Sequence, residues 1–364
     1  MEYIISNHSK ELQWELIREV VSKNEKHIIM LVKNIKVPTG NICIMKGDRG
    51  LIEFLSIGDY GKNLNIKADF LGLTKELYGV PNGEIMPLTE KWVITISTQY
   101  GCSMDCKFCD VPKVGKGLNA TLNDLTNQVI QGLKLHPEIT ATKRLNLHYA
   151  RMGEPTFNFN VIKHAKELHK IIKPYIGNST IHPVISTMLP RRNKKLMEFL
   201  NEWCDIKNET YRGCAGLQFS INSTDDNQRD DMFGGDSLSL NEIGEIGYIL
   251  PDPVGRKYTL NFALADDYVV DAKRLLSLFN PNKFIIKITP LHKTQSCEIN
   301  NITTTNGYNS FVPYKKVESD LKDVGYDVIV FIPSYDEDLG LITCGNAILS
   351  GSKPKVDYTE EIFK

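Results

Sequence analysis

The chain has 364 residues, enough to bury a full hydrophobic core, and its 41% hydrophobic and 24% charged residues are typical of a water-soluble protein. The formal net charge of −1 gives no support to nucleic-acid binding, and no apolar run approaches the roughly 18 residues of a membrane span. The first residues lack a secretory signal pattern, and eight cysteines are too sparse for a disulfide scaffold. We therefore expect a cytoplasmic protein with reduced thiols and no membrane contact.

Residues 1–85 are predicted to form a small N-terminal accessory module of mixed α and β structure. Apolar residues at helical spacing predict a helix over 10–23. Short β-type runs follow at 27–32, 41–45 and 50–56, and turn residues at 38–40 and 47–48 separate them. The sequence indicates no function for this module.

From residue 91 onward the pattern alternates between strand and helix. Thr121 is the expected N-cap of the first helix, with Asp124 three residues later. Repeated strand–helix units predict a parallel sheet with functional residues at the carboxyl ends of its strands. The predicted strands cover 92–97, 145–149, 182–186, 217–222, 257–265, 284–289 and 327–332. The predicted helices cover 121–135, 161–172, 194–203, 272–279 and 314–324.

The first strand of this region leads directly into three cysteines, Cys102, Cys106 and Cys109. Three thiolates on one tight loop can hold three irons of a 4Fe-4S cube, which leaves the fourth iron open to an external ligand. The amino and carboxylate groups of S-adenosylmethionine (SAM) suit such an iron. A zinc site or three unrelated buried thiols are the alternatives, but zinc usually takes four protein ligands and no second cysteine pair lies nearby.

With Phe108 before its last cysteine, this motif resembles the signature of the radical SAM superfamily. The resemblance implies a 4Fe-4S cluster on the three cysteines, SAM on the open iron, and cleavage of SAM to a 5′-deoxyadenosyl radical. It also implies a low-potential electron donor of the flavodoxin or ferredoxin type. The expected fold is α/β, a partial (β/α)6 radical SAM barrel over 86–290 with a C-terminal extension over 291–364.

Polar residues follow the next predicted strands at the ends where SAM would bind. Gly153 and Glu154 come after the second strand, and Glu154 is expected to accept hydrogen bonds from the SAM ammonium group. Ser186 ends the third strand, while Ser220 and Asn222 end the fourth, within reach of a ribose or carboxylate. Ordinary caps and turns are the alternative for these hydroxyl and amide groups.

In this order, the motifs resemble one branch of the superfamily: the dual-specificity rRNA and tRNA adenine-C2 methyltransferases and the related C8 enzymes. The resemblance runs from about residue 84 to 349. It implies that one SAM methylates Cys344, that the radical from a second SAM removes a hydrogen atom from the methyl group, and that the carbon then adds to adenine. It also assigns Glu84, by a loose match, to the substrate base, and His292 to the cofactor site where the branch has Asn-Pro.

The chain departs from that branch at several places, one of which is Ser220-Ile221-Asn222, where the branch has Ser-Leu-His. The branch has a second cysteine seven residues before the cluster motif, which resolves the protein–RNA crosslink, and this chain has Thr95 there. A hydroxyl cannot supply the thiolate that this step needs. Asp336, Glu337 and Asp338 replace basic residues before Cys344, and acidic groups there would repel phosphates. The basic run 191–195 could meet RNA phosphate or simply begin a solvated helix.

Three hypotheses stay open. The first is an RNA adenine methyltransferase that acts on rRNA or tRNA through Cys344. The second keeps the fold and the radical but acts on a nucleotide, a peptide or a metabolite. The third is an iron–sulfur protein for electron transfer or sensing, against which Gly153 and Glu154 argue. Four other cysteines are candidates for the missing thiol, although each is more often a small buried hydrophobe: Cys43, Cys204, Cys214 and Cys297.

Overall fold

The computed structural model describes residues 31–59, 62–74, 76, 78–79, 84–304 and 309–363. The helix predicted over 10–23 lies outside the described residues, as does most of the strand predicted over 27–32. No helix within the described residues is long and apolar enough to cross a membrane.

The described residues form one mixed sheet of 12 strands, in the order β14-β1-β2-β3-β5-β8-β9-β10-β11-β12-β13-β4, and a separate hairpin of β6 and β7. The strands from β5 to β13 in this order run parallel, which confirms the predicted α/β class with a mostly parallel sheet. Their bounds are β5 (Trp92–Ile96), β8 (Arg144–Tyr149), β9 (Thr180–Thr187), β10 (Gly216–Ser220), β11 (Tyr258–Leu264), β12 (Phe284–Pro290) and β13 (Val328–Phe331).

The strands of the predicted N-terminal module continue this sheet rather than forming one of their own. The antiparallel strands β1 (Leu31–Val37), β2 (Gly40–Gly47) and β3 (Gly50–Ile57) follow one another along its edge. Leu55 of β3 pairs directly with Thr95 of β5, and the C-terminal strand β14 (Thr359–Ile362) pairs with β1. The predicted boundary near residue 85 is therefore not a break in the sheet, because backbone hydrogen bonds join the two parts.

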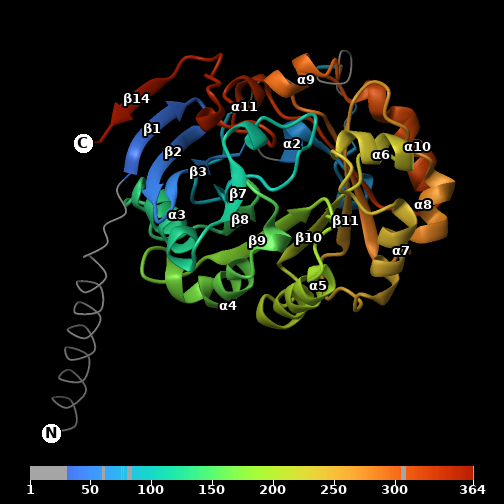
Figure 1. Cartoon of the computed structure of the whole chain (residues 1–364), viewed down its shortest axis with the longest axis horizontal. Coiled ribbons are helices and arrows are strands. Elements are labelled where there is room, and N and C mark those ends of the chain that lie inside the picture. The colour runs from blue at the N-terminus through green and yellow to red at the C-terminus, as the bar shows by residue number, and fades with distance from the viewer. Residues whose placement is uncertain are drawn as a thin grey trace, which may run out of the picture.

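Helices cover one face of the parallel strands, and in Figure 1 they lie around the outside of the molecule with the strands within. The side chains of Thr121 and Asp124 form the predicted cap at the start of α3. Apolar residues that alternate along the strands, such as Leu147, Phe219 and Ile286, pack under these helices and are fully buried. The helices are α3 (Leu122–Lys134), α4 (Asn160–Ile172), α5 (Leu196–Asp205), α7 (Leu240–Ile249), α8 (Ala272–Leu278) and α10 (Lys315–Asp323).

The opposite, inner face of the parallel strands is polar and partly open to solvent. On β8, Arg144 and His148 are partly accessible, while Leu145 and Leu147 on the other face are fully buried. The same alternation places Ser186, Asn261 and Lys287 on the inner face of three further strands. In a sheet with only a structural role, apolar side chains would cover this face. Its polar side chains therefore indicate that a functional site lies on the inner face.

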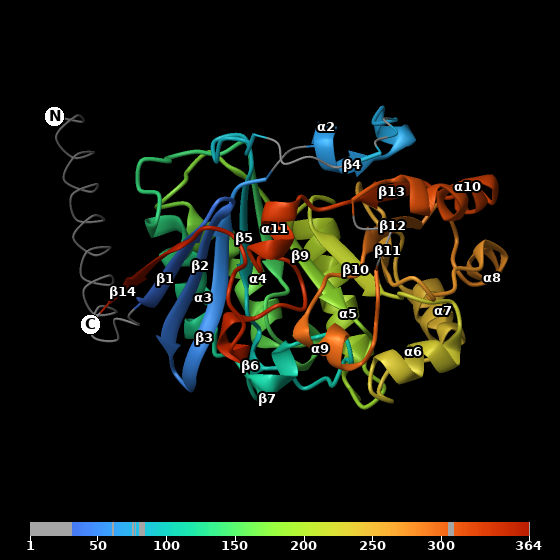
Figure 2. The ribbon, with the colours of Figure 1, turned by 90° about the horizontal axis from the view of Figure 1, so that it is seen from above.

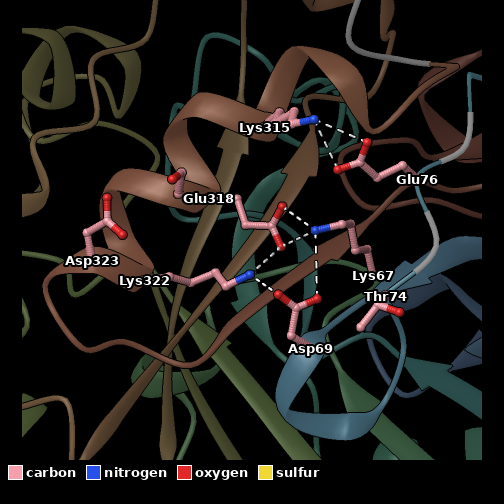
Figure 3. A pocket seen from close by; sticks show the side chains of 9 residues that line it. Lys67, Asp69, Thr74, Glu76, Lys315, Glu318, Lys322 and Asp323 are labelled. Carbon is pink, nitrogen blue, oxygen red and sulfur yellow. Dashed lines mark hydrogen bonds and ion pairs between the residues drawn. The ribbon is translucent and has the colours of Figure 1, made fainter.

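A shallow surface pocket lies at the far edge of the sheet, where β4 (Ile66–Lys67) meets α10 (Figure 3). The Lys67 ammonium contacts Glu318 at 2.7 Å and Lys315 contacts Glu76 at 3.1 Å, while Lys322 pairs with Asp69. These pairs join the short edge strand to the helix. Because its cations and carboxylates satisfy one another, we assign this pocket a structural role.

Candidate active site

The three cysteines lie on a loop at the carboxyl end of β5. The loop follows the hairpin strand β6 (Gln99–Gly101) and closes against β7 (Lys116–Asn119), with the Cys102 N–H donating to the Gly115 carbonyl at 3.1 Å. Each thiol belongs to a partly accessible residue. Figure 2 shows this hairpin at one end of the strands, on the same side as α9 (Gln295–Ile299). The predicted strand-to-loop connection is therefore present.

The thiols of the loop share one electrostatic environment. Burial raises the pKa of Cys102 to about 11, which N–H groups of Met104 and Gly153 partly oppose. Burial, and then the charges of the neighbouring thiols, also raise the pKa values of Cys106 and Cys109. Negative charge on three such sulfurs needs a cation among them, and iron supplies it in a cluster.

Three partly accessible thiols on one loop are the donor set that the predicted 4Fe-4S cluster would use. Among the described residues, no group of three His, Cys, Asp or Glu side chains is arranged as a site for a single metal ion.

Gln99 joins the cysteine loop to the turn after β8. Its side-chain carbonyl accepts from the backbone N–H groups of Ser103 at 3.1 Å and Glu154 at 3.0 Å. Its amide nitrogen donates to the Ser103 hydroxyl at 2.8 Å and to Asn119 at 2.9 Å. Sequence reasoning missed Gln99 because a single amide carries no signal until the two loops are seen side by side.

Gln99 packs so closely against the backbone of Gly153 that no side chain fits at position 153. Its φ is +96°, and an added Cβ would stand 2.5 Å from the Gln99 Cβ and 2.8 Å from the Gln99 backbone nitrogen. The expected reason for this glycine was the approach of a ligand to the backbone, and the structure adds the close passage of Gln99.

Gly153→Ala should therefore destabilise the chain by about 2–4 kcal/mol, because left-handed strain and overpacking act together. Gly235→Ala is the matched control, since Gly235 has a φ of +79° but open space around its Cα. Denaturant unfolding of both variants measures the difference. Equal losses would show that backbone strain alone matters and that the Gln99 contact is unimportant.

Glu154 is buried, and its carboxylate is fixed between two strands. It accepts from the Thr156 N–H at 3.1 Å, from the Thr156 hydroxyl at 2.8 Å and from the Met188 N–H at 3.1 Å. Burial raises its pKa, while these donors and the Thr187 hydroxyl lower it. The geometry leaves a rigid acceptor beside the cysteine loop, which suits the predicted contact with an ammonium group.

The other predicted cofactor residues have different surroundings. Ser186 lies on the inner face of β9, and Ser220 is the last residue of β10. Asn222 has a φ of +59° and its side-chain oxygen accepts from the Ala263 N–H at 3.0 Å, so that oxygen is already used to hold β11. The positive φ also ends β10 two residues earlier than the sequence predicted.

Phe108 packs against the loop after α6 (Asp226–Met232). Its ring meets Phe233 edge to face at a centroid distance of 5.8 Å, and its carbonyl accepts from the Thr294 hydroxyl at 2.8 Å. Asp110, two residues after Phe108, is buried and its carboxylate accepts a hydrogen bond from the Ser296 N–H at 2.9 Å. These contacts hold the last part of the cysteine loop against α9.

Cys344 lies on the inner-face side, directly beside the cysteine loop. The carbonyl of Gly345 accepts from the Asp110 N–H at 2.8 Å and contacts the Cys109 sulfur at 3.7 Å. The Cys344 side chain itself is exposed. A segment 235 residues away in the sequence from Cys109 thus places a free thiol next to the cysteine loop.

A buried ion pair holds the Cys344 segment in place. The Arg151 guanidinium donates to Glu53 at 2.7 Å and to the Leu341 carbonyl at 3.0 Å. The other Glu53 oxygen accepts from the N–H groups of Ile348 at 2.9 Å and Leu349 at 3.1 Å. We name these two residues, Glu53 and Arg151, the latch. Sequence reasoning missed it, although Arg151 directly precedes the motif at 152–155.

The acidic residues before Cys344 do not form the repulsive surface that the sequence suggested. Glu337 and Asp338 are buried in and around the short helix α11 (Tyr335–Leu339), and burial raises the pKa of Glu337 to about 7. The Asp338 carboxylate lies 3.5 Å from the imidazole of His292 and accepts from the Thr343 hydroxyl at 3.3 Å. These buried carboxylates therefore stabilise the fold. Through Asp338, His292 lies beside the segment that carries Cys344.

Glu84 is not brought to the site. It is exposed and lies close to Met86, whose N–H donates to the Asp59 carbonyl at 2.6 Å. Asp59 follows β3, and β3 ends where β5 begins. The cysteine loop follows the other end of β5, so the structure places Glu84 away from it.

The basic run 191–195 contacts the cysteine loop through Arg192. Its guanidinium donates to the Ser103 carbonyl, lies 3.2 Å from Asp236, and stacks 5.5 Å from the centre of the Phe157 ring. Arg192 therefore supports the cysteine loop. The two roles considered for the run, RNA contact and the start of a solvated helix, stay predictions.

No family model matches the chain. It is 26% identical over 201 residues to a dual-specificity RNA methyltransferase RlmN of Aliarcobacter butzleri, covering 53% of this chain and 51% of that protein. A probable RlmN of Thermotoga neapolitana is 28% identical over 237 residues, covering 61% and 63%. The chain thus spans about half to two thirds of the length of these relatives. A radical SAM methyltransferase from Sphaerobacter thermophilus matches in structure with a TM-score of 0.58 and 16% identity, over 87% of this chain and 80% of that chain.

The cysteine motif, the mostly parallel sheet and these similarities all resemble those of radical SAM enzymes. Among these enzymes, the similarity in sequence is to the RlmN dual-specificity RNA methyltransferases and is distant, at 26% and 28% identity for the two relatives above.

Proposed function

We propose that the chain is a radical SAM enzyme that acts through Cys344, in the manner of the RNA adenine methyltransferases that it resembles. The observation that carries this proposal is the position of the exposed Cys344 thiol beside the cysteine loop, with the Gly345 carbonyl 3.7 Å from the Cys109 sulfur. A thiol that only packed in the core would be buried.

The residues described above suit the two cofactors. Cys102, Cys106 and Cys109 would hold a 4Fe-4S cluster in a partial (β/α)6 barrel formed by the parallel strands. Glu154 and the backbone at Gly153 would bind the amino group of SAM. When bound, the cluster and SAM supply a 5′-deoxyadenosyl radical, with electrons from a flavodoxin- or ferredoxin-type donor. The protein's part is to fix the donor groups, exclude water and present Cys344.

Thr95 separates this chain from the methyltransferases at the resolving step. It lies on β5 and pairs with His148 of β8, and its hydroxyl supplies no thiolate. Among the other cysteines, Cys43 and Cys204 are buried, and Cys297 is buried beside the Phe108 carbonyl. Burial raises the pKa of all three. This observation favours a second candidate function, in which the same radical acts on a nucleotide, a peptide or a metabolite instead of rRNA or tRNA.

The decisive experiment compares the intact chain with Cys344→Ala after anaerobic reconstitution with iron, sulfide, SAM and a reductant. We expect a methyl group on the peptide that contains Cys344, and 5′-deoxyadenosine from both proteins, since Cys344 is not one of the three cluster thiols. Mass spectrometry of the peptide and chromatography of the nucleoside measure the two results. Cys214→Ala, at a thiol outside the loop, is the control.

An unmethylated Cys344 in a chain that still forms 5′-deoxyadenosine would contradict the methylated-cysteine route. It would leave the second candidate, which acts in the cytoplasm on a different substrate. A chain that binds iron and sulfide but neither binds nor cleaves SAM would contradict both and support an electron-transfer or sensing protein.

A further inference from the structure

The inner face of the sheet carries a group of cations that the proposed cofactors do not use. Arg144 begins β8, Arg256 precedes β11, and Lys287 lies in the middle of β12. Lys287 is on the inner face, where Asn261 of β11 is its direct partner in register. We call Arg144, Arg256 and Lys287 the inner cation cluster.

The members of the cluster are close enough to act on one another. Burial lowers the pKa of Arg256 to about 10, and the charge of Arg144 adds to this effect. Burial lowers the pKa of Lys287, and Arg256 contributes in the same direction. His148 reports all three charges, because burial and then the charges of Lys287, Arg256 and other cations lower its pKa to about 3. The imidazole is therefore neutral and adds no charge at neutral pH.

Few carboxylates among the described residues lie near these cations. Asp59 is the described acid whose charge acts on Lys287 and Arg144, and it forms an ion pair with a further cation, Lys91. Within the described part of the chain, neither the Arg256 guanidinium nor the Lys287 ammonium has a hydrogen bond or an ion pair from its side chain. The contact of Lys287 is with the face of the Phe331 ring at 5.4 Å. Arg144 donates to a neutral acceptor, Asn146, at 2.8 Å.

Close packing keeps Arg256 at this position. An added Cβ on Gly216 would stand 3.0 Å from its guanidinium, so the arginine lies directly over the backbone at the start of β10. Arg256 and Lys287 are both partly accessible on this inner face. Cations that repel one another and have no carboxylate partner are stabilised by a bound anion, so this arrangement indicates an anion from outside the chain.

Resting on the function proposed above, we propose that the inner cation cluster binds the phosphate group of a small substrate, with the reacting part of that substrate at Cys344. Three positive charges with no free carboxylate match a phosphate dianion better than a singly charged carboxylate. Lys287 is the member nearest to the carboxyl ends of the strands, where the cysteine loop lies, because Arg144 and Arg256 stand at the amino ends of theirs.

The dimensions fit a molecule of nucleotide size. Lys287 lies three residues before the end of β12, which at about 3.3 Å per residue is roughly 10 Å along the strand. Arg144 and Arg256 lie near the opposite ends of their strands from the cysteine loop. A substrate that reaches both Cys344 and these cations is therefore compact. This inference selects a phosphorylated small molecule from the second candidate function.

The test is a binding measurement that needs no radical chemistry. Thermal unfolding and calorimetric titration of the full chain, with and without cluster, would use inorganic phosphate, AMP, adenosine and acetate as probes. We expect phosphate and AMP to bind and to stabilise the chain, and adenosine and acetate to bind at least about tenfold more weakly. Lys287→Met and Arg256→Gln should each weaken phosphate and AMP by about tenfold or more.

Two features of the result separate a binding role from a structural one. Lys287→Met should raise the melting temperature of the chain without phosphate, since it removes a repelled charge, while it abolishes the response to phosphate. Lys322→Met, at a lysine paired with Asp69 on the surface, should leave the phosphate response unchanged. Equal phosphate responses in all four proteins, or none in the wild type, would overturn the proposal.

Failure of the anion site and failure of the proposed function give different results. Phosphate binding that depends on Lys287, in a chain that never forms 5′-deoxyadenosine, would keep the site and contradict the radical function. Formation of 5′-deoxyadenosine in a chain that binds short RNA but neither phosphate nor AMP would keep the function and overturn the site.

Discussion

Replacing Cys106 with alanine should abolish both cluster binding and SAM cleavage, the largest loss of activity expected from one substitution. The loop offers three thiols, so the variant leaves two irons of the cube without a protein ligand. Iron and sulfide content after anaerobic reconstitution, together with 5′-deoxyadenosine formation, should fall by more than about 100-fold, beyond the loss typical of residues that only support a metal ligand.

The matched control is Cys214→Ala, which removes a partly accessible thiol outside the loop. It should reconstitute as the wild type does. Cys106→Ala that kept a full complement of iron would show that the cluster has another ligand set, and would contradict the assignment of all three loop cysteines.

Breaking the latch should cause the largest loss of stability. Glu53 is fully buried and Arg151 is nearly so, and removing one partner leaves an uncompensated charge in the core. Arg151→Met or Glu53→Met should therefore cost about 3–5 kcal/mol each. Because the latch also binds the backbone of Leu341, Ile348 and Leu349, Cys344 should become more reactive toward an alkylating agent.

A double-mutant cycle gives this prediction its sharpest form. The double variant with both methionines should be less destabilised than the sum of the single variants, since it buries no unpaired charge. Lys166→Met breaks the exposed pair with Glu202, 2.8 Å apart, and should cost no more than about 1 kcal/mol. Additive losses in the cycle, or unchanged alkylation of Cys344, would show that the latch does not position the Cys344 segment.

Local patterns in the sequence predicted the parallel part of the fold well. The alternation of apolar residues on strands such as β8 and β12, and the cap of α3 at Thr121, depend on neighbours a few residues away. The same patterns could not show that β3 pairs with β5, because pairing between strands 40 residues apart leaves no periodic signal. The predicted separate module is for that reason continuous with the main sheet.

The sequence by itself identified the cysteine loop as the candidate cluster site, because the spacing of ligands on one loop can be read directly from the sequence. It also singled out Gly153 and Glu154 as candidates beside that loop, since a strand end next to it follows from the order of the units. Only the tertiary structure decided that Cys344 adjoins the loop, that Glu84 does not, and that Arg256 and Lys287 share a face. These contacts join segments up to hundreds of residues apart. They depend on sheet register and packing, which no local sequence pattern encodes.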